Sequence, residues 1–586
     1  MTVPFTRQLG PQSGVQLNPV KDNTERFVAG DANQIAAVPG RFERGRIDKA
    51  FRVNRGNLFR MLGASASISI SRLNETLVQM YEAMQRGVVE YVVYRLNVTG
   101  AVLNSMYIKD GTAASPITTA GSAPAGTKIT VKHLECFNDG ITLAINAIDN
   151  STPAVTATAN VPLTGTAPLT IGDTTVTNGM VVKLPAQTSA AENGVYTVTI
   201  TGGNYTTAAV TTKDVKLRLS DVTTGDILYE FEGSLDPAAV NEFGASTYLP
   251  NVVASQTDNV EVTVAASASI PSTSSFYGLN TDGTDKWVSA DLSYFTESST
   301  TYDSEDYDRA CTALKYGDHT FGYIHAGGTQ SVPLLSKLIA LGKDINKQVV
   351  WDVPGNLSVA AAIAFYNSLS IDSHYSQAYW APLKADDPLN GGKEYIGTSG
   401  INLGYRCARN ALTDANGVAP KHFPVAGKAY PIDRTGIIQT LTPTESDMKD
   451  LAKARINPVI FTRYASGGRY VFFDSLTGAK TESVRKLIAV ADMSSEVDDN
   501  VSAFAQEALQ LPLSEAIKRL TDFLRTYFEA LETAGWLKPS AELGNRSFVA
   551  EVKPNANRPD DRVDVGYFMH YEGTARAIYI QQTFSK

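Results

Sequence analysis

The stretch from Ser331 to Pro354 reads SVPLLSKLIALGKDINKQVVWDVP and predicts a helix followed directly by a strand. The apolar face of the helix consists of Leu334, Leu335, Leu338, Ile339 and Leu341. The next residues repeat this order, because SVAAAIAFYNSL predicts a second helix and SQAYWAPL a second strand. Helices that alternate with strands in this way predict a βαβ-type unit.

The same helix-and-strand pattern occurs near the start of the chain. In SRLNETLVQMYEAMQRG, the residues Leu73, Leu77 and Met84 recur at helical spacing, and Gly87 ends the helix. The following run, VVEYVVYRL, is largely apolar, as in strands that are buried on both faces. We therefore interpret this region and the region after residue 300 as two parts of one α/β domain.

Residues 101–290 have a different composition, dominated by Thr, Ala, Val, Ser and Gly. Short β-runs such as TKITVKH, NGVYTVTI and NVEVTVAAS alternate with turn residues, which predicts one or two inserted all-β domains. Within this segment, residues 161–200 resemble a small β-module of phage tail-fibre and adhesion proteins. The resemblance is carried by a G-x-x-V turn region and by ENGVY at Glu192 to Tyr196.

The last third of the chain combines helices with a hairpin. In TPTESDMKDLAKARIN, we expect Thr442 to cap a helix, Pro443 to begin it and Glu445 to reach back to the cap. The sequence PVIFTRYASGGRYVFFDSL predicts a hairpin with a glycine turn. Two amphipathic helices follow, in SSEVDDNVSAFAQEAL and LSEAIKRLTDFLRTYFEALETAG.

The chain ends with TARAIYIQQTFSK, from Thr574 to Lys586, which predicts a β-strand because apolar residues alternate along it. A terminal strand frays or aggregates unless it is paired. We hypothesise that this strand completes a sheet in a neighbouring copy of the chain, and that the N-terminal arm also contacts a neighbour. The predicted inter-subunit residues are Ile578, Tyr579, Ile580, Gln582, Phe584, Val3, Phe5, Val15 and Leu17.

Together these patterns predict an α+β multidomain fold. Its α/β core is expected to be discontinuous in sequence, with inserted all-β domains and extended N- and C-terminal arms. The expected parts are an N-terminal arm (1–20), a middle α/β domain (21–100 with 291–435), a β-rich insertion (101–290), a C-terminal domain (436–570) and a C-terminal strand or arm (571–586).

Composition narrows the class of protein. Of 586 residues, 43% are hydrophobic and 19% charged, which fits a folded protein with several domains. The net charge of −9 argues against a general nucleic-acid binder. Three widely spaced cysteines suggest neither a zinc site nor a disulfide framework. We find no signal peptide and no membrane-spanning run, so we expect folding and assembly in a cytoplasm and no membrane insertion.

One segment is strongly basic. From Arg41 to Arg60 there are seven Lys or Arg residues against two acidic residues. One interpretation is a site for a polyanion, and the alternative is a basic surface that meets an acidic protein surface. We favour the alternative, because no aromatic stacking pattern accompanies the basic residues.

No catalytic signature or cofactor motif is evident, so we expect no enzymatic activity and no cofactor. The sequence lacks a phosphate-binding loop, an HExxH motif and a GxSxG elbow, and GTSG around Ser399 has the wrong spacing. The six histidines are scattered, which favours structural or surface roles. The acidic run TTYDSEDYD could hold calcium, but it lacks the glycine and the distal glutamate of a calcium loop, so we favour a solvated acidic loop.

Several motifs, in their order along the chain, resemble contractile tail sheath proteins of myovirus-type phages. The first two are RFVAGDANQ…PGRFERGRIDKAFRVNRGNLFRMLG and LVQMYEAMQRGVVEYVVYRL, although Gly87 stands where that family often has two glycines. Later similarities are AYWAPL at Ala378 to Leu383, LAKARINPVIFTRYASGGRYVFFDSLTGA, and IKRLTDFLRTYFEALETAGWL…FVAEV followed by the terminal strand. VFFDSLTG departs from the usual Trp-Gly of the family. The resemblance covers most of residues 21–100 and 300–586.

The resemblance implies a structural subunit of a virion tail. Stacked hexameric rings of sheath would surround a tail tube, with the C-terminal domain facing the tube and the insertion outside. The arms would join neighbouring copies, and contraction would drive the tube through the host envelope without a nucleotide. The implied partners are other copies of the chain, the tail tube protein, and the baseplate and tail terminator proteins, with no direct nucleic-acid contact.

Two other functions remain open. The tail-fibre-like module suggests another virion component, in the baseplate or in a fibre or adhesion protein. An enzyme with a βαβ core and β insertions would require a cluster of acid, base or nucleophile that the sequence does not display.

Overall fold

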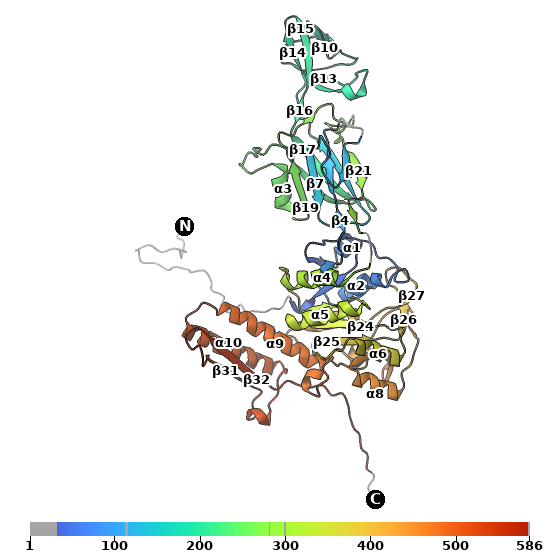
Figure 1. The fold of residues 1–586 in the computed structure, drawn as a ribbon, viewed down its shortest axis with the longest axis vertical. Helices are drawn as coiled ribbons and strands as arrows, with labels where there is room; N and C mark the ends of the chain where they lie inside the picture. The colour runs from blue at the N-terminus through green and yellow to red at the C-terminus, as the bar shows by residue number, and fades with distance from the viewer. Residues whose placement is uncertain (1–31, 112–114, 281, 298–300, 584–586) are drawn as a thin grey trace, which may run out of the picture. The chain divides into compact units, whose positions relative to one another are not determined.

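A computed structural model describes residues 32–111, 115–280, 282–297 and 301–583 (Figure 1). The chain divides into two compact units. One unit comprises Met1–Ala37, Gln79–Tyr91 and Thr320–Lys586, and the other comprises Val38–Val78 and Val92–His319. The fold is mixed α/β with many sheets, and both units are discontinuous in sequence.

The largest sheet has eight strands in the order β2-β3-β1-β23-β24-β25-β29-β30. The pairs β1–β23, β23–β24, β24–β25 and β25–β29 are parallel, and β30 pairs antiparallel with β29. Every residue of β24 and β25 is buried, as expected for strands covered on both faces. The strand bounds are β1 Ile35–Gly40, β2 Phe51–Asn54, β3 Glu90–Arg95, β23 Tyr323–His325, β24 Gln348–Val353, β25 Ser376–Trp380, β29 Ile456–Tyr464 and β30 Gly467–Phe472.

Helices cover this sheet as the sequence predicts. Helices α5, α6, α7 and α9 all pack against β24, and the predicted apolar face of α5, from Leu334 to Leu341, is buried. The predicted βαβ pattern is therefore confirmed. The helix bounds are α2 Glu75–Arg86, α5 Val332–Asp344, α6 Val359–Ser368, α7 Ser399–Asn410, α8 Glu445–Lys453, α9 Ile488–Glu507 and α10 Leu513–Thr533. A short sheet of β26 Leu383–Asp386, β27 Lys393–Tyr395 and β28 Ile438–Gln439 lies between α6 and α8 in sequence.

The predicted cap of α8 is wrong by two residues. The cap is Thr444, not Thr442, and its hydroxyl accepts a hydrogen bond from the Asp447 N–H while the Asp447 carboxylate accepts one from the Thr444 N–H. Both TPTE and TESD fit a capping pattern, so the sequence alone allowed either register. The hairpin predicted in the next segment is confirmed as β29 and β30.

Gly87, which was expected to end α2, also allows two helices to approach closely. Its φ is +155°, and a Cβ at this position would lie 2.5 Å from the backbone nitrogen of Ala408 and 2.5 Å from the carbonyl oxygen of Gly404. Both atoms belong to α7. A side chain at residue 87 would therefore push α7 away from the end of α2.

A buried carboxylate joins α7 to α9. The side chain of Asp492 accepts hydrogen bonds from Arg406, and from Arg409 at 3.0 Å between Nη2 and Oδ2. All three side chains are buried, and the guanidinium of Arg406 also lies 4.6 Å from the ring centroid of Tyr323. These neighbouring cations hold the pKa of the Asp492 carboxyl below its ordinary value, although burial alone acts in the opposite direction.

In the second unit, two four-stranded sheets enclose one apolar core. Their orders are β18-β17-β8-β21 and β19-β7-β5-β6, and inward residues such as Leu143, Leu217 and Val131 are fully buried. The bounds are β5 Ser105–Ile108, β6 Ile117–Ala120, β7 Ile129–His133, β8 Ile141–Ala147, β17 Asp214–Asp221, β18 Ile227–Ser234, β19 Val260–Val264 and β21 Val288–Leu292. Short pairs join β4 Val102–Leu103 to β22 Phe295–Thr296 and β16 Thr211–Thr212 to β20 Ile270–Pro271. The unit also contains α1 Leu58–Leu62, α3 Leu249–Gln256 and α4 Ser304–Tyr316.

A smaller module within this unit has a separate core. Its five-stranded sheet has the order β10-β15-β14-β13-β9, and β11 and β12 form a two-stranded sheet beside it. The apolar cluster of Val182, Leu184, Tyr196, Val198 and their neighbours draws only on residues 155–209. The bounds are β9 Val155–Thr156, β10 Thr164–Thr166, β11 Leu169–Ile171, β12 Thr174–Val176, β13 Val181–Leu184, β14 Gly194–Thr201 and β15 Asn204–Ala209.

The acidic run at residues 300–308 is not a solvated loop. Asp303 caps α4 by accepting hydrogen bonds from the backbone of Glu305 and Asp306, and Asp306 accepts one from the backbone of Asp303 in return. The Asp306 side chain is buried and also pairs with Arg309. Carboxylates at a helix N-terminus bind orphan N–H groups, which explains the cluster without a calcium ion.

Two members of the basic segment are interior side chains. Arg44 is buried and forms ion pairs with Asp139 and Asp221, and Arg46 is buried and paired with Asp48. Their guanidinium groups are therefore committed to carboxylates of the same chain and are not available to a polyanion. Arg52, Arg55 and Arg60 are exposed.

The described residues also show whether any helix could cross a membrane and whether the cysteines form disulfides. No helix in the described ranges is both long enough and apolar enough to span a bilayer. The three cysteines are not joined by disulfides, and Cys136 and Cys407 are buried.

We expect Asp492→Ala to destabilise the first unit strongly. Removal of this carboxylate leaves the Arg406 and Arg409 guanidiniums buried without their anion, which costs about 3–5 kcal/mol. Differential scanning calorimetry at pH 7 would show a lower unfolding temperature. The control is Asp450→Ala, which removes an exposed partner of Lys453 on α8 and should change stability by about 0.5 kcal/mol or less. Equal transition temperatures for the two variants would contradict this account.

Candidate assembly interface

The chain ends in a hairpin and an exposed segment. The hairpin consists of β31 Phe548–Pro554 and β32 Val563–Met569, which pair antiparallel from Phe548 opposite Met569 to Pro554 opposite Val563. It is a two-stranded sheet, so among the described residues neither strand has a second strand partner. An unpaired strand edge presents N–H and C=O groups that another strand can bind.

One face of the hairpin packs on α9 and α10. Phe548, Val552, Val565, Tyr567 and Met569 contact an apolar cluster that includes Leu524, Phe528 and Leu531 of α10. Isolated two-stranded hairpins are marginal in water, so these helices supply the hairpin's stability. The opposite face carries Val549 opposite Phe568, and Phe568 is 68% exposed.

A groove runs beside β31. It has a volume of about 560 Å³ and lies between α10 and the strand. On one side, the groove is lined by Arg525, Glu529 and Glu532 of α10. On the other side, it is lined by residues of β31, namely Phe548, Val549, Ala550 and Val552. Space for side chains therefore adjoins an unpaired strand edge, as strand addition requires.

The expected terminal strand does not form within the isolated chain. Residues 574–583 carry no strand, and Ile578, Tyr579 and Ile580 are 80%, 95% and 91% exposed. Gln582 is also exposed. In Figure 1 the described part of this segment leads away from β31 and β32. The prediction of a strand was based on alternation alone, and alternation cannot supply the ladder partner that a strand needs.

The remaining predicted arm residues lie outside the described residues. These are Phe584 at the C-terminal end and Val3, Phe5, Val15 and Leu17 in the N-terminal arm.

A cluster of four polar side chains in the first unit resembles a catalytic arrangement in composition. Asp352 follows the middle of β24, and its Oδ1 accepts hydrogen bonds from the backbone N–H groups of Thr398 (2.7 Å) and Ser399 (3.0 Å) at the start of α7. Its Oδ2 accepts from the Ser399 hydroxyl and from Gln79 Nε2. The Nε2 atom of His325 lies 3.0 Å from Gln79 Oε1 and 3.2 Å from Ser399 Oγ.

The hydrogen-bond directions show what this cluster does. Gln79 Oε1 can only accept, so Nε2 of His325 carries the ring proton and donates it. The other ring nitrogen, Nδ1, accepts from the Tyr91 hydroxyl at 3.1 Å. A serine nucleophile needs a histidine nitrogen that accepts its proton, whereas Ser399 donates to Asp352. All these side chains are buried, so the cluster positions α7 against β24 and is inaccessible to a substrate.

No sequence motif indicated this cluster. Gln79, His325, Asp352 and Ser399 are far apart in the chain and belong to no common motif. The expectation that His325 has a structural role is confirmed by its burial and its hydrogen bonds. Burial lowers the pKa of His325 to about 3.

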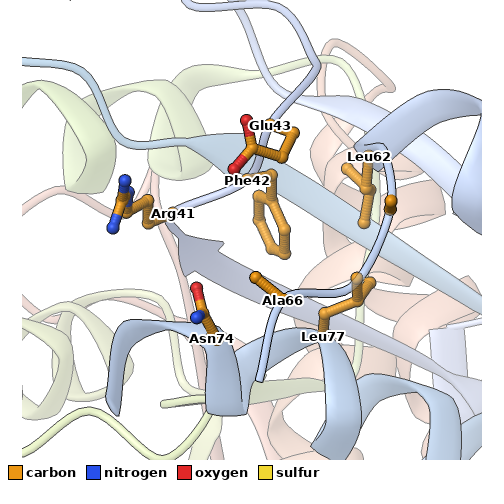
Figure 2. Close-up of a pocket in the computed structure, with 8 residues that line it drawn as sticks. Arg41, Phe42, Glu43, Leu62, Ala66, Asn74 and Leu77 are labelled. Atoms are coloured by element: carbon orange, nitrogen blue, oxygen red, sulfur yellow. The ribbon is translucent and has the colours of Figure 1, made fainter. Parts of the chain in front are cut away.

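A small cavity in the second unit does not suggest a ligand site. It has a volume of about 20 Å³, which is room for about one water molecule. Figure 2 shows Arg41, Phe42, Leu62, Asn74 and Leu77 among the side chains that line it. Within the described ranges, no three His, Cys, Asp or Glu side chains are placed to bind one metal ion.

Comparisons with known proteins found likeness only to solved structures. No protein-family model matches the sequence, and no curated protein matches it. A chain of the contracted sheath complex of an extracellular contractile injection system, called PVC, is 15% identical with a TM-score of 0.38. The match covers 47% of this chain and 75% of that chain.

Two further structures come from the anti-feeding prophage. A chain of its helical sheath in the contracted state is 13% identical with a TM-score of 0.37, covering 49% of this chain and 76% of that chain. A chain of its baseplate is 12% identical with a TM-score of 0.38, covering 49% and 75%. At scores this low the likeness alone carries no functional argument.

Stability should fall below about pH 6.5 because of His325. Its pKa is lowered to about 3 by burial, whereas an unfolded histidine titrates near 6.5. The unfolded state therefore gains a proton first, and stability present above pH 6.5 is lost as the pH falls towards 3. At pH 4 the loss should reach roughly 3 kcal/mol.

The measurement is urea unfolding at several pH values for the wild type and for His325→Gln, which cannot titrate in this range. As the pH falls from 6.5 to 4, the free energy of unfolding should decrease more for the wild type than for the variant. Parallel pH profiles would show that His325 is protonated in the folded state.

Proposed function

We propose that this protein is the sheath subunit of a contractile phage tail and that it polymerises as stacked, hexameric rings around a tail tube. The sequence resemblance supports this through the order of its motifs over residues 21–100 and 300–586. The structural observation that carries the proposal is the exposed run Ile578–Tyr579–Ile580 at the end of a chain that also has an unpaired hairpin.

Strand donation connects these two features. In the proposal, the terminal segment of one copy adds to the edge of β31 in the next copy, and apolar side chains enter the groove beside α10. Backbone hydrogen bonds then form without demands on most side chains. Full burial of an isoleucine contributes about 1.5–3 kcal/mol, so Ile578 and Ile580 together contribute roughly 3–6 kcal/mol to each contact.

Such a contact is heterologous, because the donated segment and the accepting edge are different surfaces. Heterologous contacts build rings or open helical tubes. A flexible connection between copies also allows rings to rotate during contraction while the copies stay joined. The free energy for contraction is stored in the extended assembly, so the proposal requires neither a nucleotide nor a catalytic residue.

The proposal implies partners and a location. The C-terminal domain, residues 436–570, faces the tail tube protein, and the end rings contact the baseplate and tail terminator proteins. The β-rich insertion lies outside. The subunits assemble in the host cytoplasm and remain part of the virion. The N-terminal arm, with Val3, Phe5, Val15 and Leu17, forms a second connection between copies.

Deletion of Thr574–Lys586 should give a folded monomer that cannot polymerise. The full-length protein is expected to form tubes or stacked rings in negative-stain micrographs, and the truncated protein should sediment as a monomer with an unchanged circular dichroism spectrum. Tubes formed by the truncated protein would refute strand donation. Trimers formed by the full chain under all conditions would favour a fibre component instead.

A matched pair of variants tests the side chains themselves. Ile578→Asp with Ile580→Asp places two charges on the apolar face and should block polymerisation. Gln581→Asp with Thr583→Asp adds the same charge on the alternate face and should leave most of it intact. Equal assembly by both variants would show that the apolar face is not an anchor.

Replacement of residues 152–210 by a short Gly-Ser linker should spare assembly. The module formed by these residues has its own apolar core, so its removal leaves the two four-stranded sheets intact. The contrasting variant lacks residues 101–290, which removes Asp139 and Asp221 and leaves the buried Arg44 unpaired. We expect soluble polymers from the first variant and misfolded protein from the second, as judged by electron microscopy and solubility. Loss of polymers in the first variant would give the module a role in assembly.

A further inference from the structure

The terminal segment is attached to the body at two places. The first attachment is its root, where the Glu572 N–H donates to the Trp536 carbonyl at 2.8 Å and Leu537 forms a β-bridge with Tyr571. The second is Arg576, whose Nε and Nη2 donate to the two carboxylate oxygens of Asp474 at 2.8 Å and 2.6 Å. Such a two-point pair fixes direction as well as distance.

Asp474 is a rigid anchor. It follows β30 after one residue, and its neighbour Phe473 donates a backbone hydrogen bond to the Pro458 carbonyl at 2.9 Å. The Leu476 N–H donates to the side chain of Asn457 at 2.6 Å. The Asp474 side chain is only 13% exposed. Its position is therefore set by the edge of the central sheet, and Arg576 is held to that edge.

Beyond Arg576 the described chain has no further attachment. From residue 577 to residue 583, no hydrogen bond or ion pair with the rest of the described chain occurs, and every residue is exposed. The pair between Arg576 and Asp474 is thus the last fixed point before the apolar run that begins at Ile578.

We propose that the ion pair between Arg576 and Asp474 is a latch that keeps the terminal segment from binding the hairpin of its own chain and so leaves it for a second copy. This inference rests on the proposed function, because it assigns a cause to donation between copies rather than within one. It makes Arg576 and Asp474 positioning residues, since neither enters the contact itself.

Chain length shows why a latch is needed. Four residues separate the end of β32 from Thr574, and Ile578 lies seven positions after Tyr571. An extended chain of that length reaches up to about 23 Å, so without the latch Ile578 can reach the hairpin of its own chain. With Arg576 fixed, only two residues remain, and the reach falls to about 7 Å. The latch therefore lowers the effective concentration of the segment at its own hairpin.

The strength of the latch suits a directing role. A partly exposed ion pair contributes little to global stability and is weakened by salt. It biases the direction of the segment but releases it readily when a neighbour binds. Loss of the pair should raise the critical concentration for polymerisation about two- to tenfold without unfolding the protein.

A charge exchange tests the latch. Arg576→Asp and Asp474→Arg should each raise the critical concentration, measured by sedimentation of polymer, and the double variant should restore it. Lys453→Asp on α8 makes the same change in net charge as Arg576→Asp and should have no effect. Failure of the double variant to recover, with both single variants impaired, would overturn the latch in favour of separate roles for the two residues.

A second measurement reports on the monomer, below the critical concentration. Spin labels at Thr583→Cys and Glu551→Cys, in a Cys311→Ser background, give the distance between the segment and β31 by pulsed electron paramagnetic resonance. The native pair should give long distances, Arg576→Asp should add a population of short distances, and the charge exchange should remove it. An unchanged distribution in Arg576→Asp would refute the latch.

These results separate the two proposals. If deletion of Thr574–Lys586 abolishes polymers while Arg576→Asp changes neither the critical concentration nor the distances, the latch is wrong and strand donation stands. If the deletion leaves polymers unchanged, both strand donation and the latch are wrong.

Discussion

The first unit depends on neutralising charge in its interior. Asp492 on α9 faces Arg406 and Arg409 on α7, and all three side chains are buried. A buried cation is costly unless an anion with good geometry lies beside it. The pairing therefore fixes α9 relative to the helix that covers the parallel sheet. Helix α9 in turn shares an apolar core with α10 and the terminal hairpin, so the position of the hairpin depends on this one carboxylate.

The buried cluster around Asp352 applies the same constraint to α7. Asp352 accepts hydrogen bonds from the orphan N–H groups at the helix start and from the Ser399 hydroxyl, and the neutral His325 donates to Gln79. Its residue types occur in hydrolytic sites, but the His325 nitrogen nearest to Ser399 carries a proton and cannot accept the proton of the serine hydroxyl. The hydrogen bonds of this cluster are thus explained by the positioning of α7 against β24.

Periodicity predicted the elements well and their partners poorly. The apolar face of α5 and the buried run of β24 were evident because local spacing alone determines them. The N-cap of α8 was misplaced because two threonines offered equivalent hydrogen bonds. Strand β32 was not anticipated, since its alternation is interrupted by Gly566 and its inward residues are only partly buried. The pairing of Arg44 with Asp139 and Asp221, and the meeting of Gln79 with Asp352, involve long-range contacts that no local pattern encodes. For the terminal segment the limit is different, because a strand without a partner in its own chain has no intramolecular structure to predict.

The separate core of the module at residues 152–210 has an evolutionary consequence. The apolar core of this module draws only on the module's own residues, so a substitution within that core changes the packing of the module and not that of the larger core of the two four-stranded sheets. Natural selection can then change or replace this module without repacking the larger core of the unit. The sequences of related chains should therefore diverge fastest in residues 152–210, and their surfaces should differ most in this module.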